Sequence, residues 1–227
     1  MIRVQHLSKQ YDAGMVHALE DVSLEIYKGE ICSIMGPSGC GKSTLLNMIG
    51  ALDSPTSGEI IINGRSLKRF APARYRNCMV GFIFQLHNLL PNITLLENVS
   101  LPLVPRRNIG QRQRLDMAME LLSEVGLAHR STFYPVQISV GERQRAAFAR
   151  ALVTHPAILL ADEPTGSVDS RTANVIMDAI CRRCEEEEMT ALIVTHNPDI
   201  AARAGRVMFM RDGRLPGISG TAEQAPE

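Results

Sequence analysis

Two segments near the beginning of the chain alternate between hydrophobic and polar residues. The alternation covers residues 2–7 and 18–27, and it places Val22, Leu24 and Ile26 on one side of the second segment. A period of two is typical of strands that have one buried and one solvated face. The pattern therefore predicts strands of an antiparallel sheet in this part of the chain.

Short hydrophobic runs follow, and stretches with a helical period separate them. Runs of this kind predict buried strands. Strands are expected at residues 30–35, 59–62, 80–84, 157–161, 191–195 and 206–210, and helices at 42–51 and 171–186. Strands that alternate with helices are typical of a parallel sheet with both faces covered, so the predicted fold class is α/β.

The segment from residue 95 to residue 150 has a different pattern, with hydrophobic residues at helical spacing. Its clearest helical face consists of Leu115, Met119, Leu122 and Val125. Gly126 follows where a helix commonly ends in a left-handed residue. We therefore expect a helical insertion between two stretches of strand and helix.

The composition is that of a globular protein with a core, because 45% of the residues are hydrophobic and 21% are charged. Lys plus Arg and Asp plus Glu both number 24, which gives no general attraction to nucleic acid or anionic lipid. The longest hydrophobic runs, such as residues 78–84, are far shorter than the roughly 20 residues of a membrane helix. With five irregularly placed cysteines and no signal-peptide pattern, we expect a cytosolic protein.

One domain accounts for most of the pattern. We expect it to span residues 1–213, with the helical subdomain at about 95–150, and we find no internal repeat. The tail at 214–227 is rich in Gly, Pro, Ser and Glu, and this composition predicts disorder.

A glycine-rich segment joins the expected strand at 30–35 to the expected helix at 42–51. It matches the P-loop pattern G-x-x-x-x-G-K-[ST] and consists of Gly36, Pro37, Ser38, Gly39, Cys40, Gly41, Lys42 and Ser43, with Thr44 next. Glycines let backbone N–H groups wrap around phosphates, Lys42 adds a positive charge, and Ser43 offers a hydroxyl to Mg²⁺. The alternative is a chance turn, and the flanking strand and helix argue against it. The segment predicts nucleotide binding.

A second hydrophobic strand ends in two carboxylates, Asp162 and Glu163. The carboxyl ends of strands are where α/β sheets bind ligands. Asp162 suits a ligand of Mg²⁺, and Glu163 suits a base that polarises an attacking water. Alone, this pattern also describes ordinary strand ends, but together with the P-loop it indicates an ATPase.

Residues 138–145 narrow the choice among P-loop ATPases. They read Ile-Ser-Val-Gly-Glu-Arg-Gln-Arg and resemble the signature of the ABC ATPase family, Leu-Ser-Gly-Gly-Gln/Glu, which opens a helix. The resemblance implies that Ser139, Gly141 and Glu142 bind ATP held on the P-loop of the opposite subunit, since a helix N-terminus can present N–H groups to a phosphate. A helix cap before an arginine-rich helix face is the local alternative. It does not account for the position of the segment ahead of the carboxylate pair.

Two further residues match the same family in order along the chain. Tyr11 resembles the aromatic residue that stacks on adenine, and such stacking contributes on the order of 1–3 kcal/mol per base. Gln85 resembles the glutamine that senses Mg²⁺ and the attacking water, and it leads into the helical insertion.

Two short motifs near the carboxylate pair complete the set. Residues 167–169 resemble the D-loop, with Asp169 at the seam between two subunits. Residues 195–197 resemble the motif in which a histidine, here His196, contacts the γ-phosphate. Each match is weak alone, but their order is specific, and the resemblance extends to about Gly213.

The resemblance implies an ABC cassette with the P-loop NTPase fold: a parallel core sheet, an antiparallel β-subdomain and a helical insertion. Two copies would close as a homodimer around two ATP. Each site would combine Lys42, Asp162, Glu163 and His196 of one subunit with Ser139 of the other, and Mg²⁺ would be held by Ser43, Gln85 and Asp162. Hydrolysis would open the pair, and the segment after Gln85 would pass the motion to a membrane-spanning permease subunit.

Several segments resemble one branch of this family, the lipoprotein-releasing, macrolide-efflux and cell-division ATPases. These segments are residues 84–91, 96–99, 141–145 and 161–166. We therefore expect a peripheral protein on the inner face of the cell membrane. One alternative is a soluble ABC ATPase that acts on nucleic acid. Proteins of that kind usually have tandem cassettes, a coiled coil or a basic surface, and this sequence shows none of these features. Another alternative is a regulatory module that assembles on binding ATP but hydrolyses it slowly. The presence of Glu163 and His196, two residues expected to be catalytic, argues against this alternative.

Val140 and three cysteines depart from the pattern or add to it. Val140 stands where the family has glycine, and if the position needs a positive φ or close approach, a β-branched residue costs about 1–3 kcal/mol. The alternative is that Val140 packs against the helical insertion.

Cys181 and Cys184 form C-x-x-C without a second pair, and we expect thiols on a helix surface. Cys40 is expected to face the phosphates as a reactive thiolate.

Overall fold

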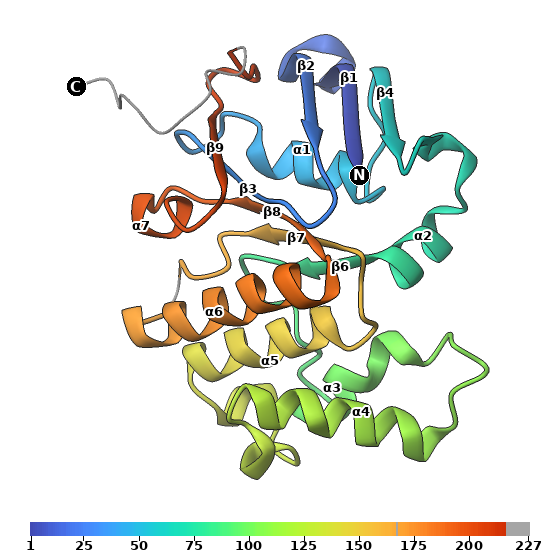
Figure 1. Ribbon diagram of the computed structural model, residues 1–227, viewed down its shortest axis with the longest axis vertical. Coiled ribbons are helices and arrows are strands. Elements are labelled where there is room, and N and C mark those ends of the chain that lie inside the picture. The colour runs from blue at the N-terminus through green and yellow to red at the C-terminus, as the bar shows by residue number, and fades with distance from the viewer. Residues whose placement is uncertain (167, 217–227) are drawn as a thin grey trace.

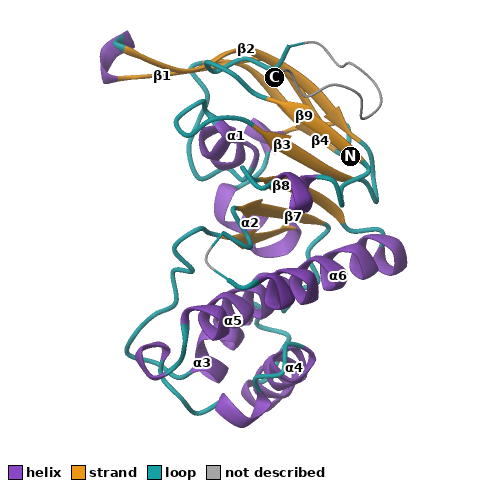
Figure 2. Cartoon of the chain, turned by 90° about the vertical axis from the view of Figure 1, so that its left-hand side faces the viewer, coloured by secondary structure: helices purple, strands orange, loops and turns teal. Residues whose placement is uncertain are grey.

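The computed structural model describes residues 1–166 and 168–216 of the chain. Its elements form layers, with an antiparallel sheet at one end, a parallel sheet in the middle and the helices of residues 95–124 at the opposite end (Figures 1 and 2). Of the tail expected to be disordered, residues 217–227 lie outside the described part. Within the described part, no helix combines the length and the hydrophobicity needed to cross a membrane.

The antiparallel sheet has the strand order β2-β1-β4-β5. Its strands are β1 (Ile2–Tyr11), β2 (Val16–Ile26), β4 (Ser57–Ile62) and β5 (Arg65–Ser66). Ile2 pairs with Ile26 on one side and with Ile62 on the other. The predicted strands are confirmed, and the β1–β2 pairing continues beyond the predicted bounds to Tyr11 and Val16.

The parallel sheet has the strand order β6-β7-β8-β3-β9, and every neighbouring pair in it is parallel. Its strands are β3 (Ile31–Met35), β6 (Val80–Ile83), β7 (Ile158–Asp162), β8 (Thr190–Val194) and β9 (Arg206–Phe209). The predicted α/β class is confirmed. Because all carboxyl ends of parallel strands meet at one edge, the segments after β3, β6, β7 and β8 come together there.

Both faces of the parallel sheet are covered, which explains why its strands read as continuous hydrophobic runs. On β7, Ile158 and Leu160 belong to the core shared with the antiparallel sheet and α1 (Lys42–Ile49), which fills the layer between the sheets. Leu159 and Ala161 belong to a second core, shared with α5 (Val140–Leu152) and α6 (Ser170–Glu187). A single strand thus supplies alternate residues to two cores.

The helical part consists of α3 (Leu95–Ser100), α4 (Gln111–Glu124) and α5, with short 3-10 turns between them. Helix α4 packs against both α3 and α5. Leu122 and Val125 are buried on the predicted face, and Gly126 has a φ of +71°, so the predicted left-handed helix end is confirmed.

Two helices and one cysteine differ from expectation. Helices α2 (Pro72–Met79) and α7 (Pro198–Ala201) were not predicted, although each begins with a proline, a common first helical residue. The expectation that Cys181 and Cys184 both lie on a helix surface is wrong for Cys184. That residue is 4% exposed because its face of α6 packs into the core, and burial raises the pKa of its thiol to about 12.

Candidate functional site

The P-loop joins β3 to α1, and two of its glycines are required by close backbone contacts. Gly36 has a φ of +153° and Gly41 a φ of +104°. A Cβ atom on Gly36 would lie 2.1 Å from the carbonyl oxygen of Met210, and one on Gly41 would lie 2.3 Å from that of Ala18. The backbone of β2 and of the residue after β9 therefore leaves room only for glycine at these two positions, as a rigid phosphate cradle requires.

Lys42 is the first residue of α1, and its side chain bends back over the loop. Its Nζ donates to the carbonyl oxygens of Gly36 and Pro37, both at 2.8 Å. The residue is only 8% exposed. Among the described residues, its ammonium bonds to these carbonyls and to the Cys40 sulfur and pairs with no carboxylate. A buried cation without a counter-ion is unfavourable, so the site favours an anionic ligand such as a triphosphate.

Asp162 ends β7 next to the P-loop. Burial raises the pKa of its carboxyl; the Glu163 charge acts in the same direction, whereas the Ser43 hydroxyl and the Lys42 ammonium oppose it. All four groups therefore lie close together at the sheet edge. A carboxylate and a hydroxyl are hard oxygen donors of the kind that Mg²⁺ prefers, so the residues present fit an ATP–Mg²⁺ complex.

Glu163 follows directly and is held by the segment after β8. Its Oε1 accepts hydrogen bonds from the backbone N–H of His196 at 2.9 Å and from Nδ1 of the same residue at 2.7 Å. Its Oε2 accepts one from the Thr195 hydroxyl at 3.0 Å. The Glu163 side chain is 11% exposed and that of His196 is 72% exposed. The structure thus brings the two predicted catalytic side chains into contact.

Tyr11 lies at the end of β1, half-exposed, and a polar cluster fixes its ring. Its hydroxyl donates to Asp53 at 2.9 Å, and Nζ of Lys9 lies 4.7 Å from the ring centroid and 2.9 Å from the other Asp53 oxygen. Partial burial opposes ionisation of Asp53, but hydrogen bonds from Lys9, Ser54 and Tyr11 lower the pKa of its carboxyl. Lys9 and Asp53 thus fix the orientation of the Tyr11 ring.

The signature segment forms a capping box at the start of α5. The Ser139 hydroxyl accepts from the Glu142 N–H at 3.2 Å, and the Glu142 carboxylate accepts from the Ser139 N–H at 2.8 Å. The Ser139 N–H is the main reason why the pKa of Glu142 is lowered. Ser139 itself is exposed, and it touches none of the residues at the sheet edge through these bonds.

Val140 is the first residue of α5, and it is not among the described residues with positive φ. The strain expected from a positive φ is therefore absent, because the position is helical and not left-handed. The other condition, close approach to the phosphate, stays a prediction. The alternative, that Val140 packs against the helical insertion, is not supported either, since the residue is 41% exposed.

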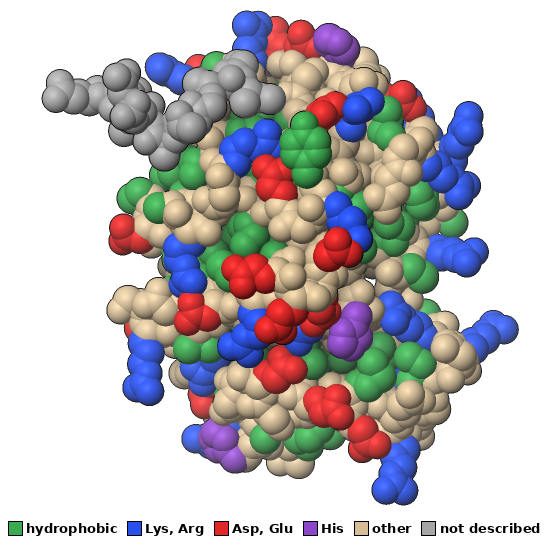
Figure 3. Space-filling model, in the orientation of Figure 1, with side chains coloured by type: hydrophobic (Ala, Val, Ile, Leu, Met, Phe, Trp, Pro, Cys, Tyr) green, Lys and Arg blue, Asp and Glu red, His purple; other side chains and the backbone are tan. Residues whose placement is uncertain are grey.

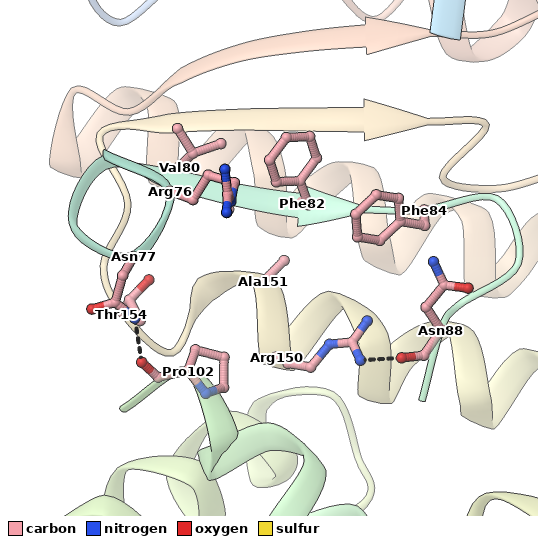
Figure 4. A pocket seen from close by; sticks show the side chains of 11 residues that line it. Arg76, Asn77, Val80, Phe82, Phe84, Asn88, Pro102, Arg150, Ala151 and Thr154 are labelled. Atoms are coloured by element: carbon pink, nitrogen blue, oxygen red, sulfur yellow. Dashed lines mark hydrogen bonds between the residues drawn. The ribbon is translucent and has the colours of Figure 1, made fainter. Parts of the chain in front are cut away.

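Gln85 lies in an exposed turn after β6, at the same sheet edge as Asp162. The turn continues into His87 and Asn88, both of which have positive φ. Arg150, near the end of α5, donates to the carbonyl oxygens of both, at 2.6 Å from His87 and 2.5 Å from Asn88. Figure 4 shows the Arg150–Asn88 bond at one end of a hollow of about 230 Å³ between β6 and α5.

Comparison with known proteins decides the family. The family described as "ABC transporter" matches residues 19–166. Over 219 residues, the chain is 48% identical to the lipoprotein-releasing system ATP-binding protein LolD of Bordetella avium, covering 94% of this chain and 95% of that protein. The protein of the same name from Bordetella pertussis is 46% identical, with 94% of each chain covered. The chain belongs to the ABC transporter family.

Solved structures of ABC cassettes have the same fold. The dimeric structure of MJ0796, a bacterial ABC transporter cassette, matches with a TM-score of 0.90 at 40% identity, covering 95% of this chain and 96% of that one. A dimeric post-hydrolysis state of the same cassette, bound to ADP and Pi, matches with a TM-score of 0.90 at 39% identity and the same coverage. The chain is an ATP-binding and ATP-hydrolysing ABC transporter subunit, as the sequence predicted.

Two predicted positions of this ABC cassette need further comment. Asp169 caps α6, where its Oδ1 accepts from the Thr172 N–H at 3.0 Å, and this bond lowers the pKa of Asp169. Its predicted neighbour Ser167 lies outside the described residues. The expectation that Cys40 faces the phosphates as a reactive thiolate is not supported, because the side chain is 5% exposed and belongs to the core between the sheets.

Several residues that organise the cassette's site were not found from the sequence. Thr195 was only named as the start of the histidine motif, although its hydroxyl bonds to Glu163. Lys9 and Asp53 hold Tyr11, and Arg150 holds the turn after Gln85. A polar residue beside a strand's carboxyl end was a usable signal for Thr195. Lys9 lies two residues before Tyr11 on the same strand, so its side chain could have been expected on the same face. Asp53 and Arg150 act across long sequence separations, for which a single sequence offers no signal.

Proposed function

We propose that this chain is the ATPase subunit of a lipoprotein-releasing ABC system and works as a homodimer on the cytoplasmic face of the cell membrane. The observation that carries the proposal is the pairing of Glu163 with His196 beside the buried Lys42 and Asp162. The choice of cargo class rests on the LolD proteins of Bordetella, whose names describe a lipoprotein-releasing system.

Each residue at the sheet edge has a distinct task in this proposal. Lys42 and the N–H groups of residues 36–44 bind the phosphates of ATP, and Tyr11 stacks on the adenine. Ser43, Gln85 and Asp162 hold Mg²⁺, which neutralises charge on the phosphates when bound. This division follows from which groups are cationic, which are hard oxygen donors and which are aromatic.

Glu163 polarises the attacking water and accepts its proton. His196 is oriented by two hydrogen bonds to the same carboxylate, from its backbone N–H and from Nδ1. This arrangement leaves Nε2 as the ring nitrogen available to the γ-phosphate. Because Thr195 occupies the second carboxylate oxygen, the Glu163 side chain has little freedom to turn away from the water.

The site is completed by a second copy of the chain. Ser139, Gly141 and Glu142 lie at the N-terminus of α5, where backbone N–H groups favour an anion. Ser139 is exposed, and its hydroxyl bonds, among the described residues, only within the capping box, so the hydroxyl is available to the γ-phosphate held by the opposite subunit. Asp169 would lie at the seam between the two copies.

The segment after Gln85 is proposed to meet the membrane-spanning subunit. Leu86 is 80% exposed there, and Leu101 and Val104 are 40% and 54% exposed close to the hollow that Pro102 lines. Large exposed hydrophobic residues near a hollow favour a protein contact. Elsewhere, Figure 3 shows positive and negative side chains interspersed over one face, which gives no basic stripe for nucleic acid.

Reconstitution tests the proposal. The full chain would be purified together with its membrane subunits, placed in vesicles that carry a lipoprotein, and supplied with ATP and Mg²⁺. We expect ATP-dependent transfer of the lipoprotein from the vesicles to a soluble acceptor. ATP hydrolysis without lipoprotein transfer, but with export of a small hydrophobic compound, would overturn the cargo class and leave the ATPase role intact.

The contact surface has its own test. Leu86→Glu is expected to prevent co-purification with the membrane subunits, because it places a charge in a hydrophobic contact. Its melting temperature should match that of the original chain, since the residue is exposed. Met15→Glu, at a hydrophobic residue between β1 and β2 that is 82% exposed, is the matched control and should co-purify normally.

A further inference from the structure

We infer that Gln144 is a positioning residue that holds Glu163 in its working conformation. Gln144 lies in the second turn of α5 and is 1% exposed. Its Nε2 donates to the carbonyl oxygen of Pro164 at 2.6 Å. Because Pro164 directly follows Glu163, this bond fixes the backbone immediately next to the proposed base.

Glu163 needs such support because its backbone is left-handed, with a φ of +48°. A residue other than glycine keeps this conformation only when its surroundings impose it. Two backbone bonds contribute: the Glu163 N–H donates to Val194 at 2.9 Å, and the Gly166 N–H donates to the Glu163 carbonyl at 3.1 Å. Gln144 supplies a third restraint from a different element, α5.

The surroundings of Gln144 also distinguish it from an ordinary core residue. Its neighbours along the helix, Ala146, Ala147 and Phe148, are fully or almost fully buried apolar residues. Its Oε1 has no hydrogen-bond partner among the residues that the structure describes. A buried amide with one unfilled acceptor is less stable than an apolar side chain of the same shape, so fold stability alone does not explain it.

The position of Gln144 links the two halves of the site, and this step rests on the proposed function. Helix α5 begins at Ser139, which is proposed to bind ATP of the opposite subunit. Through the bond from Gln144 to Pro164, the same helix also contacts the loop that carries Glu163. Glu163 is proposed to act on the ATP bound to its own subunit. A positioning contact at Gln144 would therefore make hydrolysis in one site sensitive to nucleotide contact in the other.

Substitution by side chains that cannot make the bond tests the inference in the full chain. Gln144→Met keeps the length and removes the donor, whereas Gln144→Asn keeps the amide but is too short to reach Pro164. Both are expected to lower kcat by roughly tenfold to a hundredfold, the scale of a small misplacement of a catalytic group. The Kd for ATP should change by less than about twofold, because the P-loop and Tyr11 are untouched.

Tyr75→Phe is the matched control, since Tyr75 is also 1% exposed and donates one hydrogen bond to a backbone carbonyl, that of Ile49 at 3.0 Å. It should lower the melting temperature by a similar amount and leave kcat unchanged. Glu163→Gln, measured in parallel, separates the two proposals. If it hydrolyses ATP as fast as the original chain, the proposed role of Glu163 fails, whatever Gln144 does.

If Glu163→Gln is inactive but the Gln144 variants keep full kcat, the inference about Gln144 is wrong. A parallel loss of ATP affinity and kcat would also overturn it, because that outcome indicates general damage. If neither Gln144 variant folds while Tyr75→Phe does, Gln144 serves the fold and not Glu163. A selective loss of kcat in either folded variant would support the inference.

Discussion

The two halves of the proposed ATP site differ in how much of their geometry a single chain supplies. At the edge of the parallel sheet, Lys42 is buried, and Glu163 is held by three hydrogen bonds from the segment after β8. At the start of α5, Ser139 is exposed, and among the described residues its hydroxyl and N–H bond only with Glu142, three residues further along the helix. Bonds within one chain hold the side chains of the first half in place. In the second half, the bonds of the Ser139 hydroxyl and N–H among the described residues stay within the capping box.

This difference separates nucleotide binding from catalysis. Changes to the ATP-binding residues at the sheet edge should be visible in a single subunit, as altered affinity for ATP. Changes at the start of α5 should leave the single subunit unaffected and should appear only when two copies meet. The following experiments test this division, in order of decreasing expected effect.

Glu163→Gln is expected to lower kcat by at least about a hundredfold, the usual contribution of a general base. ATP binding should persist, so the variant should accumulate as an ATP-bound dimer in size-exclusion chromatography with Mg²⁺. Glu25→Gln, at an exposed carboxylate paired with Arg3, is the control and should hydrolyse ATP normally. A Glu163→Gln chain that stays monomeric at saturating ATP would contradict the dimer mechanism.

Lys42→Ala and Ser139→Ala should each abolish most of the ATPase activity, and mixing them should restore part of it. In a mixed dimer, one site combines the intact Lys42 of one copy with the intact Ser139 of the other. ATPase activity is measured for each variant alone and for the mixture at equal total concentration. A mixture that is no more active than its components would show that the two residues do not meet across a dimer.

Asp53→Ala should weaken ATP binding by about fivefold, equivalent to about 1 kcal/mol of stacking free energy, because Tyr11 loses the group that orients its ring. Binding of inorganic tripolyphosphate, which has no base to stack, should not change. Calorimetric titration with both ligands makes the comparison. Asp178 is an exposed residue of α6 that pairs with Arg203, and Asp178→Ala is the control that should change the binding of neither ligand.

Val140→Gly should have the smallest effect. Because Val140 is already helical, glycine relieves no strain and lowers the free energy of unfolding by up to about 1 kcal/mol through helix propensity. We expect kcat to change by less than about twofold, a ratio measured on the dimer at saturating ATP. A severalfold gain in kcat would show that the valine side chain obstructs the opposite nucleotide.

Most of the sheet edge could be predicted from the sequence because its signals are local. The P-loop glycines, the carboxylate pair after β7 and the histidine after β8 each stand beside a hydrophobic run whose strand the pattern identifies. Parallel topology then brings the carboxyl ends together without further information. The class of the fold and the ATPase function followed from the same few segments.

Contacts between distant segments could not be predicted in this way. Nothing in the sequence around Arg150 shows that its guanidinium bonds to carbonyl groups far earlier in the chain. The burial of Cys184 depends on which face of α6 packs on the sheet. The right-handed backbone of Val140 depends on where α5 begins, and helix boundaries are the least certain part of such predictions.

Helix α5 reaches from an exposed end at Ser139 to Arg150, which grips the turn proposed to lead toward the membrane subunit. When two binding sites of one protein are coupled, the effect of each ligand on the affinity for the other is reciprocal. If binding of the membrane subunit changes the affinity of the closed dimer for ATP by some factor, ATP must change the affinity for the membrane subunit by the same factor. The membrane subunit would then be an allosteric ligand of the cassette, and whatever shifts its binding would shift the affinity of the dimer for ATP without contacting the nucleotide.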